Sequence, residues 1–185
     1  MNSKSQVNVR SLTTTAMMTA ILCVFAPFSI PIGDVPISLA TFVVYFSAVL
    51  LGMKKSLICV SLYILIGMVG IPVFSGWKSG VAVLAGPTGG YIVGYLLIAF
   101  CTGLLLMIVK YKLAFMILGM LIGTIGCYAL GTIWLAVQLS LSPKAALWVG
   151  VIPFLPGDVI KIVATVCIAV PVRKYLGNFL EVSVQ

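Results

Sequence analysis

An acidic and a basic residue lie one helical turn apart inside an otherwise apolar run, in the segment Pro156-Gly157-Asp158-Val159-Ile160-Lys161. In a helix, residues 158 and 161 share a face, so their side chains can meet and act on one ligand. Each charged group at membrane depth costs about 2.5–3.5 kcal/mol on insertion scales, and such groups mostly line a cavity or a binding site. Asp158 and Lys161 are therefore the first candidates for a functional site.

A purely structural interpretation of the same residues stays open. Pro156-Gly157 suits the start of a helix, where proline is tolerated and an acidic side chain can accept hydrogen bonds from free backbone amides. Asp158 would then be a helix cap, and Lys161 would be its i,i+3 ion-pair partner.

A second concentration of unusual residues lies in the loop over 74–91. It reads Phe74-Ser75-Gly76-Trp77-Lys78-Ser79-Gly80 and then Gly86-Pro87-Thr88-Gly89-Gly90-Tyr91. Glycine and proline disfavour a regular helix here, and irregular backbone at membrane depth is tolerated where it lines a cavity. The loop predicts a re-entrant cover over a pocket, with Phe74 and Trp77 as apolar walls. Trp77 equally fits an anchor at the membrane interface.

The composition indicates an all-α membrane protein. Hydrophobic residues make up 62% of the 185 residues and charged residues only 8%, against about a quarter charged in soluble domains. With about 20 residues per span, we expect one domain over residues 1–185 with six transmembrane helices. The predicted spans are Ser11–Phe28, Ile37–Met53, Ser56–Val73, Gly89–Val109, Leu113–Leu139 and Pro156–Val172.

The basic residues predict the orientation of these spans. Because loops rich in Lys and Arg resist translocation, both termini and the second and fourth loops are predicted to be cytoplasmic; they hold Lys4, Arg10, Lys54, Lys55, Lys110, Lys112, Arg173 and Lys174. The outer loops hold Lys78 and Lys144. The net charge of +8 is thus scattered over loops rather than gathered on a face that would bind nucleic acid. The first run is interpreted as a retained helix rather than a cleaved signal peptide.

Several kinds of chemistry are disfavoured by the residue inventory. The chain has no histidine, its only carboxylates are Asp34, Asp158 and Glu181, and its five cysteines lie singly in different runs. We therefore predict no catalytic residues, no metal site and no cofactor. An aspartyl pair of Asp34 and Asp158 is the alternative, but Asp34 follows a glycine in a predicted turn, where contact with solvent is favoured. The sequence also lacks a G-x-x-x-x-G-K-[ST] phosphate loop, so any dependence on ATP must come from partner proteins.

Small residues predict where helices pack closely. Gly90-x-x-x-Gly94 and Gly119-x-x-x-Gly123 are typical of faces that let two transmembrane helices approach each other.

Two motifs together carry a resemblance to a known family. Gly86-Pro87-Thr88-Gly89-Gly90-Tyr91 and Pro153-Phe154-Leu155-Pro156-Gly157-Asp158-x-x-Lys161 resemble BioY, the biotin-binding S components of energy-coupling factor (ECF) vitamin transporters, and the resemblance covers essentially the whole chain. It implies six helices, with a ligand pocket near the extracellular side that loops one and three cap. The ligand-binding residues it suggests, together with the loop chemistry, are Asp158, Lys161, Thr88, Gly86, Gly89, Tyr91, Phe74 and Trp77.

The resemblance also implies partners and a location. Biotin would be the transported ligand, and a small-residue face at Ala16 and Ala20 would dock on a transmembrane coupling subunit that joins two cytoplasmic ATPases in a bacterial cell membrane. Asp158 can accept hydrogen bonds from the ureido N–H groups of biotin, Lys161 can donate to the ureido oxygen or pair with the carboxylate, and Thr88 can complete the set. The chain departs from the family at Ala40, where relatives commonly carry glutamine.

One alternative function from another class remains. A self-sufficient secondary carrier would use Asp158 as a proton-binding carboxylate, as ionisable groups do in many carriers. Such carriers often show two related halves, and no clear repeat relates spans one to three to spans four to six.

Overall fold

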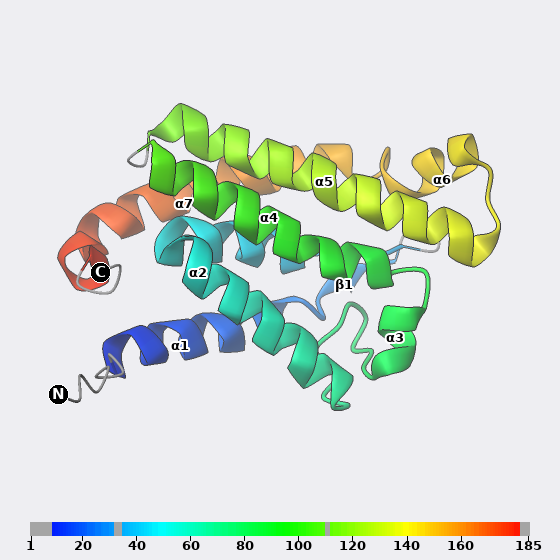
Figure 1. Ribbon diagram of the computed structural model, residues 1–185, viewed down its shortest axis with the longest axis horizontal. Coiled ribbons are helices and arrows are strands. Elements are labelled where there is room, and N and C mark those ends of the chain that lie inside the picture. The colour runs from blue at the N-terminus through cyan, green and yellow to red at the C-terminus, as the bar shows by residue number, and fades with distance from the viewer. Residues whose placement is uncertain (1–8, 32–34, 110–111, 182–185) are drawn as a thin grey trace, which may run out of the picture.

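The computed structural model describes residues 9–31, 35–109 and 112–181, with side chains as far as Tyr175. The described chain is mostly helical (Figure 1). Its elements are α1 (Val9–Phe25), β1 (Ser29–Ile30), β2 (Ile37–Ser38), α2 (Ala40–Met68), α3 (Val81–Ala85), α4 (Gly89–Ile108), α5 (Leu113–Leu139), α6 (Pro143–Gly150) and α7 (Leu155–Glu181).

Four of the described helices, α2, α4, α5 and α7, are long and apolar enough to cross a membrane, and α1 is a shorter apolar helix of 17 residues. Each of the six predicted apolar runs falls on a helix, but the second and third both fall within α2. The chain is therefore a multi-pass membrane protein.

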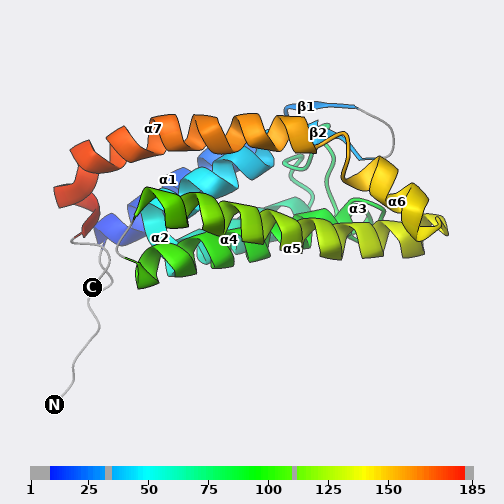
Figure 2. The same cartoon turned by 90° about the horizontal axis from the view of Figure 1, so that it is seen from above.

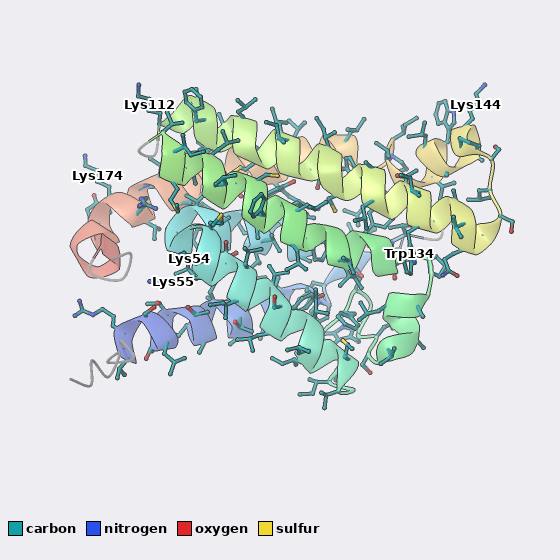
Figure 3. All side chains as sticks on the ribbon, in the orientation of Figure 1. Lys54, Lys55, Lys112, Trp134, Lys144 and Lys174 are labelled. Carbon is teal, nitrogen blue, oxygen red and sulfur yellow. The ribbon has the colours of Figure 1, made fainter. Side chains whose placement is uncertain are left out.

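Helix α2 reverses its direction at Gly52. This residue has φ 75° and ψ 179°, a conformation outside the helical region that essentially only glycine adopts. Strand β2 before the helix and α3 after it lie toward one end of the molecule (Figure 2), while Lys54 and Lys55 lie at the opposite end (Figure 3). The chain thus runs toward the lysine-rich end before Gly52 and back again after it, which accounts for the two predicted runs in one helix.

Helices α4 and α5 pack closely at positions where glycine has no side chain. A Cβ atom on Gly90 would lie 2.4 Å from the Cβ of Trp134, and one on Gly94 would lie 2.6 Å from the Sγ of Cys127. On the facing helix, Gly123 approaches the Cα of Ile98 in the same way. The predicted packing role of the small-residue faces is confirmed.

The lysines are distributed unequally between the two ends of the molecule. Lys54, Lys55, Lys112 and Lys174 lie at one end, where α1 begins and α7 ends, and Lys144 lies at the other (Figure 3). Lys4, Asp34 and Lys110 lie outside the described residues.

The end opposite the lysine cluster carries the connecting segments that cover the core. Strands β1 and β2 pair antiparallel, Ser29 with Ser38 and Ile30 with Ile37, in the first loop. The third loop is irregular from Gly70 to Gly80, as its glycines predicted, and then forms the short helix α3, which the sequence did not indicate. The two loops are joined by a hydrogen bond from the Gly76 N–H to the Pro27 carbonyl, 3.0 Å long.

Candidate functional site

Asp158 and Lys161 form a buried ion pair in the first two turns of α7. The Lys161 Nζ lies 3.1 Å from Asp158 Oδ1, and the side chains are 11% and 8% exposed for Lys161 and Asp158, respectively. The backbone explains the pairing, because residues three apart in a helix lie on one face. The same ammonium group donates to the Thr41 hydroxyl on α2, at 2.9 Å.

The Asp158 carboxylate gathers donors from three helices. Its Oδ2 accepts a hydrogen bond from the Tyr128 hydroxyl on α5, and its Oδ1 accepts from Lys161 and, at 3.4 Å, from the Thr41 hydroxyl on α2. Its backbone N–H bonds to the Phe154 carbonyl within the helix start. The carboxylate is thus directed at neighbouring helices rather than at the amides of its own helix, which distinguishes it from a helix cap. The ion pair with Lys161 is present.

A cavity of about 40 Å³ lies directly on this network. Its walls come from the first loop and from α2, α4, α5 and α7, so every long helix of the described chain contributes. The lining residues are Val35, Pro36, Ser38, Thr41, Tyr91, Tyr95, Cys127, Tyr128, Phe154, Asp158 and Lys161.

A second cavity of about 30 Å³ lies beside the first, beneath the third loop. It is lined by Val35, Pro36, Phe74, Ser75, Lys78, Val83, Thr88, Tyr91, Ile92 and Tyr95. The two cavities share Val35, Pro36, Tyr91 and Tyr95, so these four residues form the partition between them. Ligand sites for small molecules typically measure about 300–1,000 Å³. Both of these cavities are far smaller, so a ligand of that size would enter them only if lining residues moved. We call the arrangement in which both cavities are this small the closed conformation.

The structure brings five of the eight predicted ligand-binding residues to these cavities. Asp158 and Lys161 line the first cavity, Phe74 and Thr88 line the second, and Tyr91 lines both. The Tyr91 hydroxyl is already engaged, donating to the Gly150 carbonyl at 3.0 Å. Its ring, stacked on Phe154, is the part that faces the cavities.

Gly86 and Gly89, both predicted to bind the ligand, instead support the segments around the cavities. The Gly86 carbonyl accepts a hydrogen bond of 2.9 Å from the Trp134 indole N–H. A Cβ on Gly89 would lie 1.7 Å from the Leu84 carbonyl oxygen, which no neighbouring backbone can tolerate. Gly89 therefore lets α4 begin directly beneath α3, and neither glycine lines a cavity.

Trp77 lies outside both cavities. It is 60% exposed and packs its ring edge-on against Phe28, with centroids 5.6 Å apart. Its φ of 59° places it in the left-handed region, where a bulky residue is strained. Trp77 therefore joins the third loop to the first through Phe28, and it does not form a wall of either cavity.

Three site residues were missed when the sequence was analysed for chemistry. Tyr128 and Tyr95 are tyrosines in apolar runs, where nothing in the local pattern separates a ligand contact from a core residue. Thr41 directly follows Ala40, the position at which the chain departs from the family. Pro36 and Ser38, which precede Ala40, line the first cavity together with Thr41.

Ala16 and Ala20 lie on the exposed face of α1. The opposite face of this helix is buried through Thr15, Met18 and Thr19. The two alanines lie one turn apart on this face, among the larger exposed side chains of Leu12, Met17 and Val24.

Comparisons with known proteins agree with one another. The family model described as the BioY family matches residues 1–178. The biotin transporter BioY of Thermotoga maritima is 39% identical over 90% of this chain and 97% of its own length. The biotin transporter BioY2 of Lactococcus lactis is 34% identical over 91% of this chain and 92% of its own. These relatives are transporters rather than enzymes, as predicted.

A solved structure shares the fold. The crystal structure of the S-component for biotin from an ECF-type ABC transporter superimposes with a TM-score of 0.83 at 32% sequence identity. The match covers 94% of this chain and 95% of that one.

Proposed function

The chain belongs to the BioY family, and we propose that it is the biotin-binding S component of an ECF-type importer in a bacterial cytoplasmic membrane. It captures biotin on the extracellular side, and partner ATPases supply the energy for release into the cell. The observation that carries this proposal is the buried Asp158–Lys161 pair, set with Tyr128 and Thr41 on a closed cavity beneath two loops.

The chemistry of the site suits biotin. The ureido ring presents two N–H donors and one carbonyl acceptor, which the Asp158 carboxylate and the Lys161 ammonium complement. In the closed conformation these groups satisfy each other, so they need no ligand to remain buried. Apolar and aromatic side chains, among them Val35, Tyr91 and Phe154, enclose the bicyclic body.

In this proposal, biotin enters when the first and third loops move away from the cavities. The cavities of about 40 and 30 Å³ merge when Val35 and Pro36 of the first loop move away from Tyr91 and Tyr95 of α4. The loops move together, because the Gly76–Pro27 hydrogen bond and the Phe28–Trp77 contact join them.

Six membrane crossings follow when the two arms of α2 are counted separately. The crossings are then α1, both arms of α2, α4, α5 and α7, and the connections at the lysine-rich end are short. Loops rich in lysine stay in the cytoplasm. The start of α1 and the end of α7 are therefore cytoplasmic, and the cavities face outward. Ala16 and Ala20 on α1 then form the docking face for the coupling subunit, since small residues allow close helix approach. That subunit joins two cytoplasmic ATPases.

Calorimetric titration of biotin into the purified, detergent-solubilised chain tests the proposal, with thiamine and riboflavin as controls. Saturable heat with biotin alone is the expected result. A folded, monodisperse sample that gives no heat with biotin would refute the substrate assignment.

A proton-coupled carrier remains the contrasting hypothesis, because Asp158 is a buried carboxylate within a span. Its carboxylate is held in an ion pair with Lys161 at 3.1 Å, an arrangement that a binding site for a polar ligand explains without proton coupling. Uptake in cells that lack the ATPases, abolished by collapse of the proton gradient, would support the carrier and oppose the S-component function.

A further inference from the structure

Two buried hydroxyl groups lack a hydrogen-bond partner among the described residues, those of Tyr63 and Thr102. Both residues are 0% exposed. Other buried threonines of the helices, such as Thr124 and Thr165, donate to a carbonyl one turn earlier. An unpaired buried hydroxyl is rare in folded proteins and calls for a specific explanation. For Tyr63, the surroundings supply one.

Tyr63 lies directly behind Phe74. The two rings meet edge to face with centroids 5.6 Å apart. Phe74 itself is 0% exposed and lines the cavity beneath the third loop. Its ring occupies the space that Gly67 leaves open, because a Cβ on Gly67 would lie 2.2 Å from the Phe74 Cζ. The Phe74 ring is therefore the wall between this cavity and Tyr63.

Phe74 differs from the other aromatic residues of this cavity in its backbone. Tyr91 and Tyr95 belong to α4, which is packed tightly on α5 through its glycines. Phe74 instead belongs to an irregular segment in which Gly70, Gly76 and Gly80 all have positive φ. Its ring fills the space beside Gly67 and contacts Tyr63, so displacement of the ring would open the cavity toward Tyr63.

The charge distribution indicates which end of the ligand reaches this cavity. At the first cavity the Lys161 ammonium is neutralised by Asp158. The second cavity is lined by Lys78 together with the hydroxyl-bearing Ser75 and Thr88. A cation with hydroxyl donors suits a carboxylate, and the ureido ring then lies at Asp158 and Lys161.

We propose that Tyr63 is a further ligand-contact residue, covered by Phe74 in the closed conformation, whose hydroxyl donates to the carboxylate of bound biotin once Phe74 has moved aside. This inference rests on the proposed function. The unpaired hydroxyl is then the counterpart of a ligand group.

The test compares Tyr63→Phe with the matched control Thr102→Val, since each substitution removes only an unpaired hydroxyl. Unfolding of both ligand-free variants should show stability equal to or above that of the wild-type chain, because no bond is lost. Biotin affinity should fall about tenfold in Tyr63→Phe, as expected for the loss of a buried bond to a charged group, and should stay unchanged in Thr102→Val.

The ligand is varied as well. Biotinol, in which an alcohol replaces the carboxylate, should bind the wild-type chain more weakly and should be much less sensitive to Tyr63→Phe. Equal biotin affinity of Tyr63→Phe and wild type would overturn the proposal, and an undiminished effect of Tyr63→Phe on biotinol would overturn the carboxylate contact. If the wild-type chain binds no biotin, the proposed function itself fails and the inference falls with it.

Discussion

Removal of the buried ammonium group tests whether the Asp158–Lys161 pair serves stability, binding or both. In Lys161→Met the Asp158 carboxylate remains 8% exposed but loses its cation. Coulomb's law with an effective dielectric constant near 20 gives about 5 kcal/mol for unit charges 3.1 Å apart. Removal of one partner from a buried pair typically costs about 3–5 kcal/mol. We expect Lys161→Met to lower the free energy of unfolding by roughly that amount.

The double variant Asp158→Asn/Lys161→Met separates the two roles. It leaves no buried charge, and the asparagine amide oxygen can still accept from Tyr128, so most of the lost stability should return. Biotin binding should not return, because neither the anionic acceptor nor the cationic donor is present. Equilibrium unfolding in mixed micelles, followed by tryptophan fluorescence, gives the stabilities, and calorimetry gives the affinities.

Two results would refute this reasoning. Wild-type stability of Lys161→Met would show that the Asp158 carboxylate is not held in a low-dielectric site. Wild-type biotin affinity of the double variant would show that the pair is a structural feature of α7 and lies outside the binding site.

Three further predictions concern other parts of the molecule. Replacement of the exposed Ala16 by tryptophan should leave biotin affinity unchanged but abolish ATP-dependent uptake in cells that contain the coupling partners; normal uptake would remove the docking face. Gly52→Ala should destabilise the fold by about 1–3 kcal/mol, since alanine is strained at φ 75°, whereas the control Gly126→Ala, which meets only Leu97 side-chain atoms at 3.5 Å or more, should be neutral or stabilising in the same unfolding assay. Tyr128→Phe removes one donor to the Asp158 carboxylate and should weaken biotin binding about tenfold by calorimetry, and equal affinity would place Tyr128 outside the binding machinery.

The predicted apolar runs located the helices well because membrane burial requires long, continuous hydrophobic segments. The runs Leu113–Leu139 and α5 coincide, and α4 begins at Gly89 as predicted. The short helices α3 and α6 were not predicted, since each has fewer than nine residues and no apolar run of spanning length. The reversal at Gly52 leaves α2 formally continuous, but it lies beside Lys54 and Lys55, where the sequence predicted the break between the second and third spans.

The charged residues of the candidate site were predictable from the sequence, whereas its tyrosines were not. Asp158 and Lys161 stood out because few residues in this chain are charged. Tyr128 and Tyr95 did not, because a tyrosine in an apolar helix is an ordinary core residue until its neighbours are known. The loop motif correctly indicated irregular backbone over a cavity, but only the structure separates the wall residue Phe74 from the exposed Trp77.

The closed conformation explains how a membrane protein keeps a strongly polar site without a ligand. Lys161 donates to Asp158 and Thr41, and the carboxylate also accepts from Tyr128, so the charged network is internally satisfied. Under the proposed function, biotin would compete with these bonds, and a ligand with fewer polar contacts than the ureido group is expected to bind more weakly. Selectivity would then arise from the cost of breaking the network as well as from the contacts that form.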